Sequence, residues 1–236
     1  MNNDAWRKQL KFYLNKKKHI LNVFQFEDEL NKDSVSVILA DTKFIKKFES
    51  YKIISIDATF DATPQIEDAG QLLIIMAKYK EKFVPIIWTL MSNKLERTYV
   101  QIFKFIKQKV MKGLNPIQCI CDYERGLHNA IRIVFDKCHV TGCYFHYVQS
   151  LRKHYIEHGF NFIVDETRKD ESLNKHFLKY LKYFKQFWIK TVDKKTLSVY
   201  RIKDLTNNSQ ERFHKLLTRN AIAIVYQREL RIDDIY

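Results

Sequence analysis

Hydrophobic and polar positions change period several times along the chain, and each change marks a predicted element. Residues 53–60 alternate with a period of two, but both sets are apolar or small, which is typical of a strand covered on both faces. Apolar runs at 71–79 and 83–91 predict two more strands, and the short polar connection between them indicates a hairpin. From residue 96 the spacing becomes helical, and Gly113 is expected to end that helix.

Two strand–helix units follow. The segment PIQCIC at 116–121 predicts a fourth strand, with a helix after it over 124–135. The segment KCHVTGCYF at 137–145 predicts a fifth strand, and a further helix starts near His146. The predicted order is three strands joined by hairpins, followed by helix, strand, helix, strand and helix. This is the element order of the ribonuclease-H-like fold. We therefore predict an α/β protein with a mixed five-stranded sheet and flanking helices.

The remaining pattern divides the chain into four parts. Residues 1–50 read as a helical and mixed N-terminal region, and 51–155 hold the first part of the ribonuclease-H-like core. Over 156–203 the apolar positions recur at helical spacing and no strand signal is seen, so an all-helical insertion is predicted. Residues 204–236 are expected to hold the C-terminal helix that completes the core.

The charge of the chain points to a polyanionic partner. Its 41 Lys and Arg against 27 Asp and Glu give a formal net charge of +14, and the predicted insertion is basic as well. Nucleic acid is the first candidate partner and an anionic membrane surface the second. No run of about 18 apolar residues exists, so no transmembrane helix is predicted.

Three acidic residues stand where metal-dependent phosphodiester chemistry would need them. Asp57 lies within the first predicted strand, Asp122 directly follows the fourth, and Glu211 lies early in the last helix. Carboxylates that converge on two divalent ions, Mg²⁺ or Mn²⁺, can activate a nucleophile and stabilise the leaving oxygen. Singly, each acid also has a structural interpretation, as a paired buried acid, a helix N-cap or a first-turn acid.

Four segments in this order resemble the transposase domain of Mutator-like elements (MULE), over about residues 50–220. They are IDATFDATP, PIQCICDYERGLHNAIRIVF, HVTGCYFHYVQSLRK and TNNSQERFHKLL. In that family the acid of a D-x-T-F strand matches Asp57, the second Asp matches Asp122, and the Glu of the T-N-N-x-x-E-x-x-H helix matches Glu211. The family's C-x-x-H motif corresponds to Cys143 and His146.

The resemblance implies a DDE-type transposase core that binds two divalent ions, Mg²⁺ or Mn²⁺, through Asp57, Asp122 and Glu211. It implies that His146 has a functional role near the metal site. The implied partners are transposon-end and target DNA and a second copy in a synaptic complex, with no membrane partner. A nuclear location follows from the family only, because no clear targeting signal is present in the sequence.

Several assignments stay open from the sequence. Asp61 competes with Asp57, four residues earlier, although it lies beside a predicted turn. Glu124 is either a second group near Asp122 or a solvated helix acid. His146 is either functional or a histidine at a helix start that bonds the backbone, and Cys143 is expected to pack in the core. For Trp188, packing is favoured over base stacking.

Three functions remain to be separated. The first is an active cut-and-paste DNA transposase core, which cuts a strand by metal-dependent hydrolysis and then joins the freed 3′-hydroxyl to target DNA. The second is a domesticated, transposase-derived DNA-binding or regulatory protein. The third is a ribonuclease-H-like nuclease with another substrate.

Overall fold

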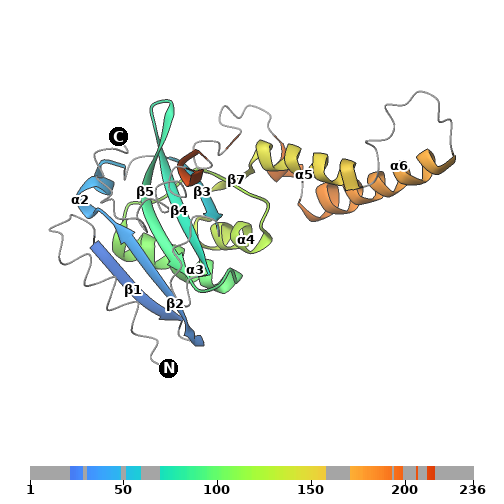
Figure 1. Cartoon of the computed structure of the whole chain (residues 1–236). Coiled ribbons are helices and arrows are strands. Elements are labelled where there is room, and N and C mark those ends of the chain that lie inside the picture. Colours follow the sequence, from blue (N-terminus) through green and yellow to red (C-terminus); the bar gives the residue numbers. More distant parts are fainter. Residues whose placement is uncertain are drawn as a thin grey trace.

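A seven-stranded mixed sheet forms the centre of the protein (Figure 1). The computed structural model describes residues 22–28, 31–48, 52–59, 70–157, 171–192, 194–198, 206 and 212–215. The strands are β1 (Asn22–Asp28), β2 (Asn31–Ala40), β3 (Ile53–Thr59), β4 (Gln71–Tyr79), β5 (Lys82–Met91), β6 (Gln118–Cys121) and β7 (His139–Gly142). Their order across the sheet is β1-β2-β5-β4-β3-β6-β7.

The sheet has an antiparallel part and a parallel part that meet at β3. Strands β1, β2, β5, β4 and β3 pair antiparallel with their neighbours, whereas β6 and β7 run parallel to β3. The five predicted strands are all present, and β4 and β5 form the predicted hairpin. Parallel neighbours need crossovers, and the predicted helices of residues 96–110 and 125–134 supply them.

The prediction for residues 1–50 is wrong over 22–28 and 31–40, and the sheet has more than five strands. Strands β1 and β2 occupy this stretch, where helical and mixed structure was expected. Residues Ser36 to Ala40 pair with β5, and Val37 and Ile38 are buried. Pairing satisfies backbone groups that β5 would otherwise expose at the sheet edge, so a tertiary partner overrides the local signal. The proposed domain division stays a prediction.

Helices cover one face of the sheet. They are α2 (Thr42–Ile45), the 3-10 turn η1 (Lys46–Phe48), α3 (Glu96–Phe105), the π-helix η2 (Ile106–Val110) and α4 (Arg125–Val134). Their apolar residues form one cluster with alternate side chains of the strands, such as Ile54, Ile56, Leu73 and Ile75. This cluster is the main hydrophobic core.

A second, smaller cluster lies on the opposite face. Leu72, Ile74 and Met76 of β4 face this side, together with Phe213. Residues 212–215 form a short helical segment, and Phe213 brings it into contact with the sheet. Residues near the C-terminal end of the described chain therefore lie against the same sheet face as alternate residues of β3 and β4.

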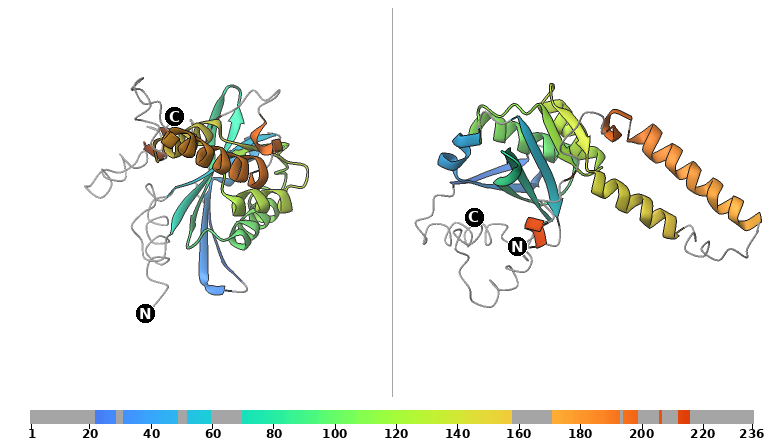
Figure 2. Two further views of the ribbon diagram at one scale, coloured as in Figure 1. Left: turned by 90° about the vertical axis from the view of Figure 1, so that its right-hand side faces the viewer. Right: turned by 90° about the horizontal axis from the view of Figure 1, so that it is seen from above.

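Two helices project from the sheet domain as an arm, which is drawn in yellow and orange in Figures 1 and 2. They are α5 (Tyr144–Glu157) and α6 (Glu171–Phe184), and the π-helix η4 (Lys185–Thr191) continues α6. The short helix α7 (Lys194–Leu197) follows, so the described residues of the predicted insertion are nearly all helical. Within the described chain, no helix has both the length and the apolar character needed to cross a membrane.

Candidate active site

Asp57 is a buried carboxylate in the sheet. It lies in β3 with a relative exposure of 6%, and it pairs in register with Ile74, a member of the second cluster. Removing a carboxylate from water is costly unless a partner compensates. The compensating contact here is with His214, whose Nδ1 lies 3.3 Å from Oδ2 of Asp57. The segment 212–215 therefore brings His214 to Asp57 and Phe213 to the second cluster.

Asp122 lies at the end of the neighbouring parallel strand. The pairing of β3 with β6 runs to Ser55 opposite Ile120, and extending this register by two residues would set Asp57 level with Asp122. Cys119 and Cys121 belong to the main core on the helix face. The alternation of side chains thus directs Asp122 to the opposite face, the face of Asp57. Adjacent strands are about 4.8 Å apart, so this register would bring the two acids close to each other at the same end of their strands.

The local contacts of Asp122 do not match the helix-cap interpretation. The N-cap of α4 is Glu124, which makes no side-chain capping bond. Oδ1 of Asp122 accepts a hydrogen bond from the Glu124 backbone N–H at 3.2 Å, one residue before the helix. The Asp122 carbonyl oxygen lies 2.5 Å from Nε2 of the buried His128. These contacts hold the strand end in place and leave the carboxylate half-exposed.

His214 is uncharged at neutral pH. The carboxylate of Asp57 favours an imidazolium, but burial and, second, the nearby His146 act against it and lower the pKa of His214 to about 4. We take burial as decisive, because a histidine this enclosed loses most of its hydration. The contact with Asp57 is then that of a neutral imidazole with a carboxylate, at 3.3 Å between Nδ1 and Oδ2.

His146 lies in the first turn of α5, half-buried and beside the Phe145 ring. Its effect on His214 puts it within electrostatic reach of the Asp57–His214 pair. The structure therefore joins Asp57 of β3 to His214 of the segment 212–215, and His146 of α5 acts on this pair through its charge. Cys143 is fully buried, as expected for a packing residue.

A buried polar chain beside Asp122 had no clear sequence signal. Gln71 Nε2 donates to the Tyr99 hydroxyl at 2.7 Å, and Tyr99 in turn bonds the Glu124 carboxylate. Burial and, second, the negative charge of Asp122 raise the pKa of Glu124. Glu124 is half-buried, so the interpretation as a solvated helix acid is wrong. Only the polar Gln71 at the start of an apolar strand hinted at this chain.

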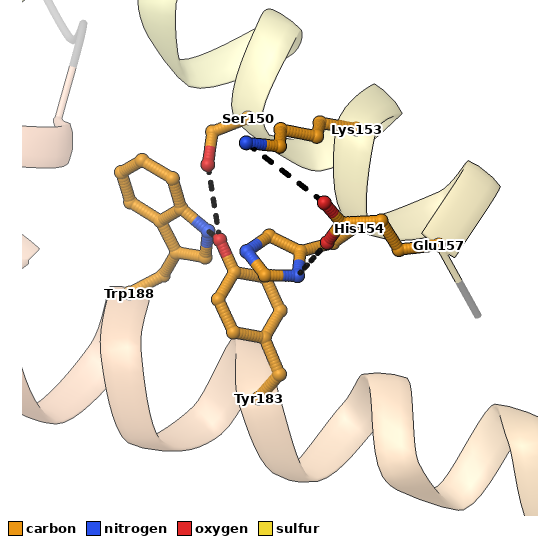
Figure 3. Close-up of polar contacts among 6 residues, drawn as sticks. All are labelled: Ser150, Lys153, His154, Glu157, Tyr183 and Trp188. Atoms are coloured by element: carbon orange, nitrogen blue, oxygen red, sulfur yellow. Dashed lines mark hydrogen bonds and ion pairs between the residues drawn. The ribbon is translucent and has the colours of Figure 1, made fainter.

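The arm is anchored next to Asp122. Trp188 of η4 is fully buried, and its ring packs edge-to-face against Tyr123 and Tyr147, each at a centroid distance of 4.7 Å. Trp188 Nε1 donates to the Tyr183 hydroxyl at 3.0 Å, and that hydroxyl also lies 3.1 Å from Ser150 Oγ (Figure 3). Packing, as favoured from the sequence, is the observed role of Trp188.

Two of the acids considered in the sequence analysis, Glu211 and Asp61, lie outside the described residues. Among the residues that are described, no group of three or more His, Cys, Asp or Glu side chains could hold a metal ion. Asp57 and Asp122 nevertheless supply oxygen donors of the kind that Mg²⁺ and Mn²⁺ prefer. The donor chemistry fits such an ion, provided that a third ligand completes the site.

The comparison with protein families agrees with this geometry. Residues 53–150 match the family model of the MULE transposase domain, which confirms the resemblance over the part of the chain that holds Asp57, Asp122 and His146. A function related to transposases, and with it DNA as a partner, follows from this match. A comparison with curated proteins gives no match.

Proposed function

We propose that the protein is the catalytic core of a DNA transposase, which cuts a DNA strand by metal-dependent hydrolysis and transfers the freed 3′-hydroxyl to target DNA. The observation that carries this proposal is the position of Asp57 and Asp122. The register of β3 with β6, extended by two residues, would set them level on one face of the sheet. The strand order β5-β4-β3-β6-β7, with helices between the parallel strands, supports a ribonuclease-H-like fold.

Asp57 and Asp122, with Glu211 as the third ligand, would hold Mg²⁺ or Mn²⁺, two ions being expected. When bound, such ions supply activation of the attacking oxygen and stabilisation of the leaving oxygen. His214 is a positioning residue in this proposal. Its Nδ1 lies 3.3 Å from Oδ2 of Asp57 and would hold that carboxylate in place, and the neutral ring adds no positive charge that would compete with a cation.

The reaction would follow from this arrangement. Water attacks a phosphorus atom of the strand and the P–O3′ bond breaks, which leaves a 3′-hydroxyl and a 5′-phosphate. The 3′-hydroxyl then attacks a phosphodiester of the target strand, so one P–O bond forms as another breaks. A nuclear location and self-association during the reaction are part of the same proposal.

Cleavage by Asp57→Asn and Asp122→Asn variants tests the proposal. We expect each to lose Mn²⁺- or Mg²⁺-dependent nicking of duplex DNA by about a thousandfold or more, which corresponds to about 4 kcal/mol. DNA binding should not weaken, because each change removes a negative charge near phosphate. Asp136→Asn, an exposed acid beyond α4, is the matched control and should cleave normally.

Further variants and substrates sharpen the result. Glu211→Gln should be as inactive as the two Asp variants, whereas a dead Asp61→Asn with an active Asp57→Asn would reverse the choice between these acids. Preferred cleavage of RNA–DNA hybrid or RNA would identify a different nuclease. DNA binding without cleavage of any substrate would identify a domesticated protein.

A further inference from the structure

A pocket of about 420 Å³ lies between α4 and η4. Three cationic side chains line it: Arg125 and Arg132 of α4 and Lys190 of η4. Two aromatic rings, Tyr123 and Phe187, line it as well. None of its lining residues, all of which are in the described part of the chain, is acidic. The pocket therefore presents concentrated positive charge beside an aromatic surface.

The walls of the pocket are held in place by contacts outside it. Arg132 donates to the Thr196 hydroxyl of α7 at 2.9 Å, which ties α4 to the end of the arm. Phe187 packs edge-to-face on the buried Trp188 at 4.9 Å, while about a third of its surface (36%) stays exposed. Arg125 and Lys190 are exposed. Arg132 and Phe187 thus form a fixed part of the pocket, whereas the exposed side chains of Arg125 and Lys190 can adjust to a bound anion.

The size and composition of the pocket suit one nucleotide. Pockets for small ligands span about 300–1,000 Å³, and a lone phosphate would use only the cations. A phosphate with an attached base would use both the cations and the exposed ring of Phe187. Bases in a duplex are stacked inside the helix, whereas those of a single strand can stack on aromatic side chains.

We propose that this pocket binds one nucleotide unit of single-stranded DNA, with its phosphate against Arg125, Arg132 and Lys190 and its base against Phe187. The choice of DNA as the polymer rests on the proposed function. Tyr123 lines the pocket and directly follows Asp122. A strand held here would thus pass close to the candidate active site, which gives the pocket a role in positioning a cut or displaced strand.

The test measures binding of fluorescein-labelled (dT)8 to the full chain by anisotropy, without divalent metal. We expect Arg125→Gln/Lys190→Gln to weaken binding at least about tenfold, since two charge-assisted contacts are lost. Phe187→Leu should weaken it about fivefold or more through the lost stacking. The control is Lys46→Gln/Lys47→Gln, which removes the same charge from exposed positions of η1 that do not line the pocket.

The outcomes separate the alternatives. Equal losses in the pocket and control variants would overturn the proposal, because general charge would then explain the binding. An equal loss for (dT)8 and duplex, with no effect of Phe187→Leu, would overturn the nucleotide assignment in favour of a simple phosphate contact. Competition by dTMP at millimolar concentration, weakened in the pocket variants, would support the pocket and show that it takes a free nucleotide too.

The test is independent of catalysis. The Asp57→Asn variant should bind (dT)8 as the unchanged chain does, and circular dichroism should show that the pocket variants keep their fold. If the protein cleaves no substrate, while the pocket variants still lose (dT)8 binding, the proposed function is wrong and the proposed role of the pocket is supported. If the protein cleaves DNA but the pocket variants bind (dT)8 normally, only the proposal for the pocket is wrong.

Discussion

The sheet domain and the arm of α5, α6 and η4 are stabilised in different ways. In the sheet domain the helices bury whole apolar faces, and α3 alone contributes Tyr99, Ile102 and Phe103 to the main core. Helix α5 has no buried residue, and large apolar side chains such as Phe177 and Leu178 of α6 stay exposed. The carboxylates thus belong to a domain held together by a large core, whereas many of the cations belong to an arm with few buried residues.

The arm meets the sheet domain at the aromatic junction around Trp188. Tyr123 is enclosed there between the Trp188 ring and Gly142. The tyrosine ring lies so close to Gly142 that a side chain at position 142 would overlap it. The residues on both sides of this contact are functional candidates. Asp122 precedes Tyr123, and Cys143 and His146 follow Gly142. Placing the arm and shaping the active-site edge therefore depend on the same few side chains.

The largest effect is expected from removing the junction. Trp188→Ala should lower the free energy of unfolding by about 3–5 kcal/mol, because a fully buried indole leaves a cavity. Chemical denaturation measures this change, and hydrogen exchange should show α6 losing protection before the sheet. Phe177→Ala, an exposed apolar residue of the same arm, is the control and should change little. Unchanged protection of α6 in Trp188→Ala would mean that the arm is stable by itself.

A smaller effect is expected from crowding the same junction. Gly142→Ala should cost about 1–3 kcal/mol, because its Cβ must displace the Tyr123 ring. Gly126→Ala in α4 is the matched control: its Cβ would meet Glu96 at an ordinary 3.4 Å, and alanine favours the helix by about 1 kcal/mol.

The double variant Gly142→Ala/Trp188→Ala sharpens the comparison. Tyr123 could then move into the space left by the indole, so the combined loss of stability should be smaller than the two single losses together. Strict additivity in denaturation experiments would show that Tyr123 does not connect the two positions.

The smallest effect concerns the outer surface of the arm. Lys179, Lys182 and Lys185 are all exposed, and replacing them with Gln should flatten the dependence of DNA affinity on salt. The slope of log affinity against log salt should change by about 0.9 for each lost phosphate contact with duplex DNA. The control replaces Lys43, Lys46 and Lys47, three exposed lysines of the sheet domain. If the two triple variants give the same slope, the arm is not the DNA-facing region.

The sequence predicted the parts of this molecule that local pattern can encode. The five core strands, the hairpin of β4 and β5 and the helix after each parallel strand follow from periods of two and 3.6, which reflect backbone geometry. Asp57 stood out because a charge in an apolar strand needs compensation. Asp122 stood out because it directly follows a buried strand, β6, which pairs in parallel with the strand of Asp57.

Only the tertiary structure decided which distant residues meet. It added β1 and β2 to the edge at β5, set His214 against Asp57, joined Gln71 and Tyr99 to Glu124, and buried Trp188 on Tyr123. These contacts join segments that are far apart in the chain, or they depend on burial that arises only when the elements pack together. Local periodicity states which face of an element is apolar, but not which partner will cover it or which polar group will meet a buried charge.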